Sequence, residues 1–152
     1  MSETVRRTMV ASIVYRDPKT ALAWLQSTFG FTCSMVIRTA DGSIAHAELQ
    51  FGDSYVMIGP EWTARAVSPL ATDGRNTQSV HVTLESGLDI HCARTRLAGA
   101  LILREPQDQF YGDRVYAVAD PEGHVWSFAQ TMRHVTREEA AAASGLTIEG
   151  WY

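Results

Sequence analysis

The 152 residues are 45% hydrophobic and 20% charged, which excludes a disordered, collagenous or coiled-coil chain. The formal net charge of -4, with scattered Lys and Arg, argues against nucleic acid as the main partner, because phosphate binding needs clustered basic side chains. No stretch approaches the roughly 18 uncharged apolar residues of a membrane span. We therefore expect a cytoplasmic protein with no nucleic-acid or membrane partner. Its two cysteines, Cys33 and Cys92, are too few for a disulfide framework, so we expect both to be reduced and buried.

The first half of the chain predicts a strand, a helix and three further strands. An apolar, β-branched run over residues 8–15 predicts the first strand. Asp17 then suits the N-cap of a helix, Pro18 its first position and Gly30 its end. Turn signals separate the three strands that follow. We expect these strands at residues 32–39, 45–51 and 54–59.

The same order of elements returns after a polar link. A strand at residues 79–84 precedes a helix at residues 88–98, which ends at Gly99. Three strands complete the second half, at residues 101–105, 114–119 and 123–130. Two matching βαβββ units indicate duplication of one supersecondary unit, neither copy of which covers its sheet alone.

These patterns predict an α+β fold made of two βαβββ modules with curved mixed sheets, followed by a short C-terminal helical extension. We expect an N-terminal module at residues 1–62, a linker at 63–77, a C-terminal module at 78–133, and a helix and tail at 134–152.

The C-terminal extension predicts one short helix and an apolar tail. Thr136 is followed three residues later by Glu139, which is the spacing of a capping box, and Gly145 suits the end of the helix. The closing segment is too apolar for a free tail, so we expect it to pack over the body or against a second subunit of a homodimer. Its large apolar residues are Leu146, Ile148, Trp151 and Tyr152.

Three motifs resemble one protein family. The most specific is DPEGHVWSF at residues 120–128, preceded by YGDR at 111–114, and YRDPKTALAWLQSTFGF at 15–31 supports both. Together they resemble the glyoxalase, bleomycin-resistance and extradiol-dioxygenase group, the vicinal oxygen chelate superfamily, and most closely its bleomycin-resistance branch. The resemblance covers most of residues 8–131. It implies that each four-stranded sheet curls into a half-barrel and that paired half-barrels enclose a ligand cavity.

The resemblance also implies where a divalent metal binds in the members that use one. Their ligands, usually His, Gln or Glu, come from the first and last strands of both modules. The equivalent positions here fall on Val10, Met57, Ser79 and Ser127. An isopropyl group, a thioether and two hydroxyls are poor ligands for such an ion. We therefore expect no metal and no other cofactor, and we assign the four residues, with Ser12, to ligand binding.

The histidines give one catalytic candidate. His81 stands two residues beyond Ser79, on the same side of its strand as Thr83, where it acts as an acid or base or as a hydrogen-bonded structural residue. His46 and Glu48 share a strand face that we expect to be exposed and solvated. We expect His124 to hydrogen-bond backbone at its turn, and His91 and His134 to lie on the surface.

Aromatic and basic residues complete the candidate site. Trp24 and Trp126 occupy predicted core positions, whereas Trp62, Phe110 and Tyr111 lie in predicted loops, where a large ring covers the core or meets a ligand. Arg114 pairs with Asp113 or Asp108, or meets an anionic ligand. We assign Phe110, Tyr111 and Arg114, together with His81 and Thr83, to the ligand-binding set.

These residues favour a metal-independent protein that binds or sequesters a small, mostly planar molecule, as antibiotic-sequestering members of the family do. One alternative is a glyoxalase-like lyase or isomerase, or a ring-cleaving dioxygenase, with a metal held by other residues. A further alternative is an enzyme that has lost the metal and uses His81 as a general base. The ligand, and whether the modules pair within one chain or between two, stay open at this point.

Overall fold

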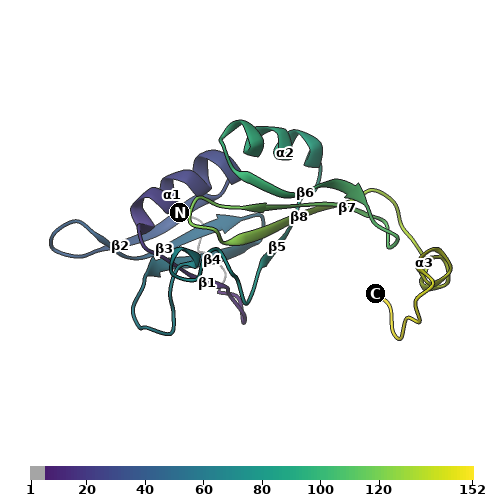
Figure 1. Cartoon of the computed structure of the whole chain (residues 1–152), viewed down its shortest axis with the longest axis horizontal. Helices are drawn as coiled ribbons and strands as arrows, with labels where there is room; N and C mark the ends of the chain where they lie inside the picture. The colour runs from purple at the N-terminus through teal and green to yellow at the C-terminus, as the bar shows by residue number, and fades with distance from the viewer. Residues whose placement is uncertain (1–5) are drawn as a thin grey trace. The chain divides into compact units, whose positions relative to one another are not determined.

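A computed structural model describes residues 6–152, and its elements repeat one order twice (Figure 1). The first half contains β1 (Ser12–Tyr15), α1 (Pro18–Trp24), a π-helical turn (Leu25–Phe29), β2 (Thr32–Arg38), β3 (Ile44–Phe51) and β4 (Ser54–Pro60). A 3₁₀ turn (Pro69–Ala71) follows. The second half contains β5 (Val80–Thr83), α2 (Leu88–Leu97), β6 (Leu101–Asp108), β7 (Asp113–Ala119), β8 (Val125–Thr131) and finally α3 (Arg137–Ser144). The predicted α+β class with two βαβββ modules is confirmed.

The chain divides into two compact units, each built on one four-stranded sheet. The first unit holds the described residues up to Gln78 together with Asp120–His124, and the second holds Ser79–Ala119 and Val125–Tyr152. The strand orders are β1-β4-β3-β2 and β5-β8-β7-β6. In each sheet the first strand runs parallel to the last, and the other pairs are antiparallel. The module boundaries expected from the sequence stay a prediction.

In the first unit, α1 covers one face of the sheet. Ile13, Ile58 and Ala47 are partners in one register row across β1, β4 and β3, and all three are buried. Asp17 caps α1 as predicted, because its carboxylate accepts the N–H of Thr20. The helix ends in the π-helical turn, where Gly30 at φ 87° donates its N–H to the carbonyl of Leu25. The sequence pattern predicted the length of this segment but not its change of hydrogen bonding.

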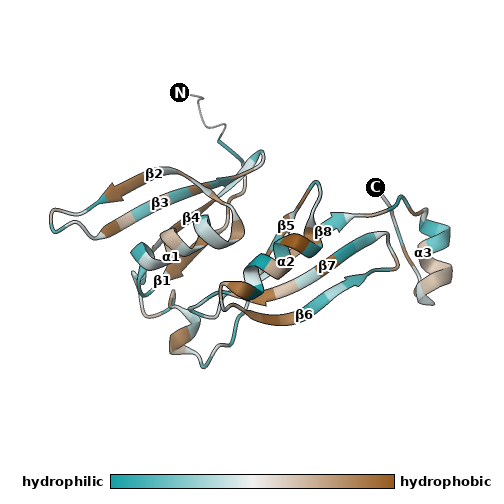
Figure 2. Ribbon diagram, turned by 90° about the horizontal axis from the view of Figure 1, so that it is seen from above, coloured by the Kyte–Doolittle hydropathy of each residue, from teal (hydrophilic) through white to brown (hydrophobic). Residues whose placement is uncertain are grey.

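In the second unit, α2 covers the sheet with a stripe that includes a histidine. Its buried residues are Leu88, His91, Cys92 and Thr95, which follow helical spacing. The prediction that His91 lies on the surface is wrong. Its Nδ1 is 2.6 Å from the hydroxyl of Tyr116, and its ring centroid is 4.4 Å from that of Phe128. The helix mixes hydrophilic and hydrophobic residues along its length (Figure 2), so hydropathy alone conceals which face is buried.

Two element boundaries differ from the prediction by three residues or more. β1 begins at Ser12 rather than at residue 8, and β6 continues to Asp108 rather than ending at residue 105. Pro106 is tolerated within β6 because this strand lies at the edge of its sheet, with register shifts around Arg104. Of the tryptophans expected in the core, Trp126 is fully buried and Trp24 half-buried. Cys92 is buried and Cys33 half-buried, and both are free thiols.

The C-terminal extension folds on itself. The predicted capping box between Thr136 and Glu139 is present, and Gly145 ends α3 at φ 71°. Trp151 donates its indole N–H to the carbonyl of Val135 at 3.1 Å, and its ring stacks on that of Tyr152, which is 96% exposed. Among the described residues, α3 makes no extensive contact with another helix or strand. Packing of the tail over the body or on a second subunit therefore stays a prediction.

No helix within residues 6–152 combines the length and the apolar character that crossing a membrane requires.

Replacing Gly112 should destabilise the second unit more than replacing another glycine of similar φ. A Cβ on Gly112, at φ 105°, would collide with the carbonyl oxygen of Arg133, whereas one on Gly42, at φ 87°, would meet nothing. We expect Gly42→Ala to lower the free energy of unfolding by about 1–2 kcal/mol, the cost of a left-handed backbone. Gly112→Ala should cost about 2 kcal/mol more, because it adds steric overlap. Urea denaturation of both variants measures the difference, and equal losses would contradict the prediction.

Two buried tyrosines should make stability fall at alkaline pH. Burial raises the pKa of Tyr116, and burial together with the neighbouring Asp120 carboxylate raises that of Tyr15. In the unfolded chain both ionise near pH ~10, so above that pH only the unfolded state gains from ionisation. The free energy of unfolding should therefore be insensitive to these groups below about pH 9 and decline above about pH 10. Tyr15→Phe and Tyr116→Phe should each make the decline shallower in urea titrations, and unchanged slopes would refute this.

Candidate functional site

The open face of the first sheet, opposite α1, brings together part of the predicted ligand-binding set. Ser12, Met57 and Glu48 are register partners across β1, β4 and β3, one residue out of step with the row beneath α1. Because successive residues of a strand point to opposite faces, these side chains lie on the open face. Val10 lies in the segment just before β1 and is half-buried.

The open face of the second sheet carries the matching row. His81 of β5 is the register partner of Ser127 of β8, which in turn pairs with Ala117 of β7. Thr83 lies one step along the same face, and Ser79 stands just before the strand. His81, Thr83 and Ser79 are exposed, and Ser127 is half-buried. The pairs Ser12–Met57 and His81–Ser127 thus occupy equivalent places in the two sheets.

A buried carboxylate on the first open face was missed by the sequence interpretation. Glu48 is only 4% exposed, so the expected solvated face is wrong for this residue. One of its oxygens lies 3.0 Å from Nη1 of Arg6 and 3.4 Å from Nε2 of His46. Hydrogen bonds to Tyr55 and Glu48 raise the pKa of the Arg6 guanidinium. The pairing with Arg6 allows a carboxylate to be buried beside Met57.

The remaining candidates lie away from the His81 row. Arg114 is on the opposite face, where its guanidinium bonds Asp108, one of the two expected partners, and Asp89 of α2, each at 2.9 Å. Phe110 and Tyr111 form an edge-to-face pair in the β6–β7 hairpin, with ring centroids 5.2 Å apart. Both rings are half-buried, whereas Trp62 is 77% exposed.

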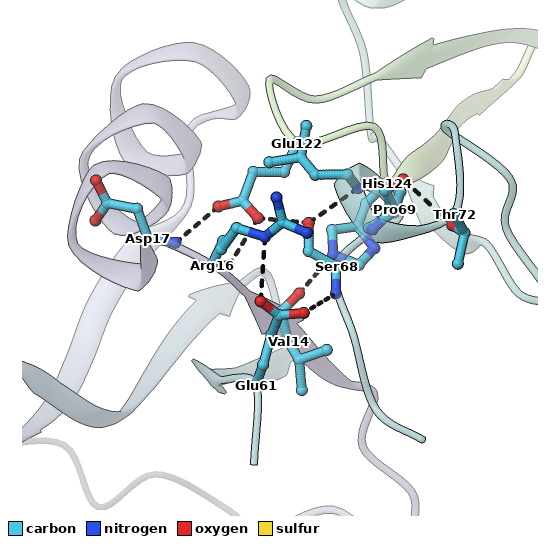
Figure 3. Close-up of polar contacts among 10 residues, drawn as sticks. Val14, Arg16, Asp17, Glu61, Ser68, Pro69, Thr72, Glu122 and His124 are labelled. Carbon is cyan, nitrogen blue, oxygen red and sulfur yellow. Dashed lines mark hydrogen bonds and ion pairs between the residues drawn. The ribbon is translucent and has the colours of Figure 1, made fainter. Parts of the chain in front are cut away.

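The DPEGH turn, Asp120–His124, binds the junction between β1 and α1, and we call it the 120–124 clamp. The carboxylate of Glu122 accepts the backbone N–H groups of Arg16 and Asp17, at 2.7 and 2.9 Å, and the hydroxyl of Ser68 at 2.6 Å (Figure 3). Asp120 accepts the hydroxyl of Tyr15 at 2.6 Å. These bonds fix where β1 ends and α1 begins.

His124 completes the clamp. Its Nε2 lies 2.7 Å from the carbonyl oxygen of Val14, so this nitrogen carries the proton and donates it (Figure 3). Its ring also meets that of Tyr15 edge-on at 4.8 Å. The expected backbone bond of His124 is present, but its acceptor is β1 rather than its own turn. No local pattern identifies an acceptor so far away in the chain.

The four residues that the sequence resemblance equates with the family's metal ligands do not fit a divalent ion. Val10 has no donor atom, Met57 offers a thioether, and Ser79 and Ser127 offer neutral hydroxyls. In the part of the chain that the structure describes, no three His, Cys, Asp or Glu side chains gather closely enough to hold a metal. His46 and Glu48 provide two donors, and the third group at that point is the cationic Arg6.

Comparisons with known proteins agree with this architecture. The family model described as the glyoxalase/bleomycin resistance protein/dioxygenase superfamily matches residues 7–128. An uncharacterised protein of Mycobacterium bovis is 28% identical over 99% of this chain and 100% of its own length. The crystal structure of TioX from Micromonospora sp. ML1 is 35% identical, covers 86% of this chain and 100% of its own, and has a TM-score of 0.66. TnmS3, an antibiotic binding protein from Streptomyces sp. CB03234, shares the fold at 16% identity, with coverages of 85% and 98% and a TM-score of 0.62.

Glu122→Gln should weaken the clamp without changing the size of the side chain. An amide group offers one acceptor oxygen where the carboxylate uses two, and its NH₂ would face a backbone N–H. We expect a loss of about 1–3 kcal/mol in the free energy of unfolding, from urea denaturation. Glu85→Gln, at an exposed position, is the matched control and should change stability by less than about 0.5 kcal/mol. Equal effects of the two variants would show that the clamp contributes nothing.

Proposed function

Because the chain belongs to the glyoxalase/bleomycin resistance protein/dioxygenase superfamily, we propose that it binds a small, mostly planar organic molecule without a metal. The observation that carries the proposal is the donor chemistry of the open faces. Met57 and Ser127 occupy equivalent positions in β4 and β8, where metal-using relatives carry strong ligands, and neither holds a divalent ion well. Recognition is therefore left to shape, apolar contact and a few hydrogen bonds.

The open faces suit such a ligand chemically. Met57 supplies a polarisable thioether that adapts to flat rings, while Ser12, Thr83 and Ser127 supply hydroxyls. Such hydroxyls are the kind of polar group that orients a ligand in small-molecule sites. TnmS3 is an antibiotic binding protein with the same fold, which supports an antibiotic as the ligand class, and we propose an aromatic one. We also propose that the protein is a cytoplasmic homodimer.

A second candidate function is catalysis by His81. This residue is exposed on the open face and stands in register with Ser127, so its imidazole is free to meet a substrate proton. A glyoxalase-like lyase or isomerase, or a dioxygenase, would additionally need metal ligands other than the four family positions.

Ligand binding should survive a chelator and depend on the open face. In a screen of aromatic antibiotics by tryptophan fluorescence, we expect saturable quenching that is unchanged by EDTA. Ser127→Phe, which places a ring on the open face, should raise the dissociation constant by about ten-fold or more, equivalent to about 1.4 kcal/mol. The exposed Ser86→Phe is the matched control and should leave the constant unchanged.

Stoichiometric Mn, Fe, Ni or Zn in elemental analysis of the purified protein, with binding lost in EDTA, would refute the proposal. Turnover that His81→Ala abolishes while binding persists would instead establish the second candidate function.

A further inference from the structure

The first unit contains a cavity on the α1 side of its sheet, away from the open face. It measures about 340 Å³, which lies within the range of roughly 300–1,000 Å³ for small-molecule sites. Tyr15 points to the α1 side because it stands two residues after Ile13 in β1 and therefore shares its face, whereas Ser12 points to the open face. The cavity is therefore distinct from the surface to which we assign the main ligand.

The walls of the cavity are mainly apolar and partly aromatic. They come from the end of β1, from α1, from the 3₁₀ turn and from the clamp. Trp24, half-buried, is held edge-on against Phe29 with ring centroids 4.7 Å apart. The apolar lining residues are Tyr15, Ala21, Trp24, Leu25, Leu70 and Pro121.

The carboxylates of the wall are already hydrogen-bonded within the protein. Glu122 accepts two backbone N–H groups and the hydroxyl of Ser68. Asp120 accepts the hydroxyl of Tyr15 and the N–H groups of Glu122 and His124. Asp17 accepts the N–H and hydroxyl of Thr20. An occupant therefore needs no charged group to satisfy them.

The charge of the rim opposes an anion. Three carboxylates, Asp17, Asp120 and Glu122, border the cavity. The one cation among its lining residues is Arg16, whose Nε lies 3.3 Å from the carboxylate of Glu61. An anionic occupant would meet net repulsion there, whereas a neutral ring would pack against Trp24 and Leu25 at no electrostatic cost.

The clamp also makes the cavity preformed. It ties Pro121 and Glu122 on one side to the start of α1 on the other, so the walls need little ordering when a ligand enters. The volume, the apolar lining and the satisfied polar groups favour an uncharged apolar occupant, and the acidic rim disfavours an anionic one. We propose that this cavity is a second small-molecule site, which takes a neutral aromatic compound of a few fused rings.

Calorimetric titration with 1-naphthol, a neutral two-ring probe, tests the proposal on the full-length protein. We expect saturable binding of one probe per chain, and at least about ten-fold weaker binding of the anionic naphthalene-1-sulfonate. Ala21→Phe, which fills the cavity from α1, should abolish binding. Ala23→Phe, on the exposed side of the same helix, should leave it unchanged. Ser127→Phe should also leave it unchanged, which separates this site from the open face.

Ala21 is buried, so a large side chain at this position can also disturb folding, and a second variant at a more exposed position tests the cavity independently. Leu70 is 50% exposed, and Leu70→Ala removes one wall without filling the interior; it should weaken 1-naphthol about three-fold or more. Leu97→Ala, 89% exposed and outside the cavity, is its control. Absence of saturable binding, equal affinity for the sulfonate, or insensitivity to both cavity variants would overturn the proposal. A change in the oligomeric mass of the Ala21→Phe variant would also overturn the proposal, because it would indicate that a side chain of a second copy of the protein fills the cavity.

Discussion

The carboxylate of Glu122 holds the first unit in shape. It accepts the exposed backbone N–H groups of Arg16 and Asp17, which lie between the end of β1 and the start of α1. Asp120 and His124 add bonds to Tyr15 and Val14 on either side. One short turn therefore holds the end of β1 and the start of α1 in place.

The two faces of the first sheet differ in character. On the open face, β1 and β4 present Ser12 and Met57, with the buried carboxylate of Glu48 and its exposed partner Arg6 beside them. On the α1 side, the same strand presents Tyr15 beside Trp24 and Leu70. Of the four positions that the family resemblance equates with metal ligands, Val10 and Met57 belong to the first unit, and neither side chain is a good ligand for a divalent ion. The second surface owes its shape to the clamp.

The sequence predicted the elements well because each depends on local chemistry. Asp17, Gly30 and the Thr136–Glu139 capping box all act on backbone within a few residues. It failed where burial depends on distant partners. Glu48 is buried because Arg6 reaches it from another segment, and His91 because Tyr116 and Phe128 lie beneath α2. The DPEGH motif was recognisable, but its bonding partners in β1 and at the start of α1 stand more than a hundred positions earlier.

The clamp is contributed by the second half of the chain and used by the first. Residues 120–124 lie between β7 and β8 of one sheet, yet they group with the unit built on the other. A fragment that ends at Gln78 would contain every strand and helix of the first unit but would lack the Glu122 carboxylate that bonds its β1–α1 junction. The two modules are consecutive along the chain, but the first one takes hydrogen-bond acceptors from a turn encoded within the second, so the first module is not structurally self-sufficient.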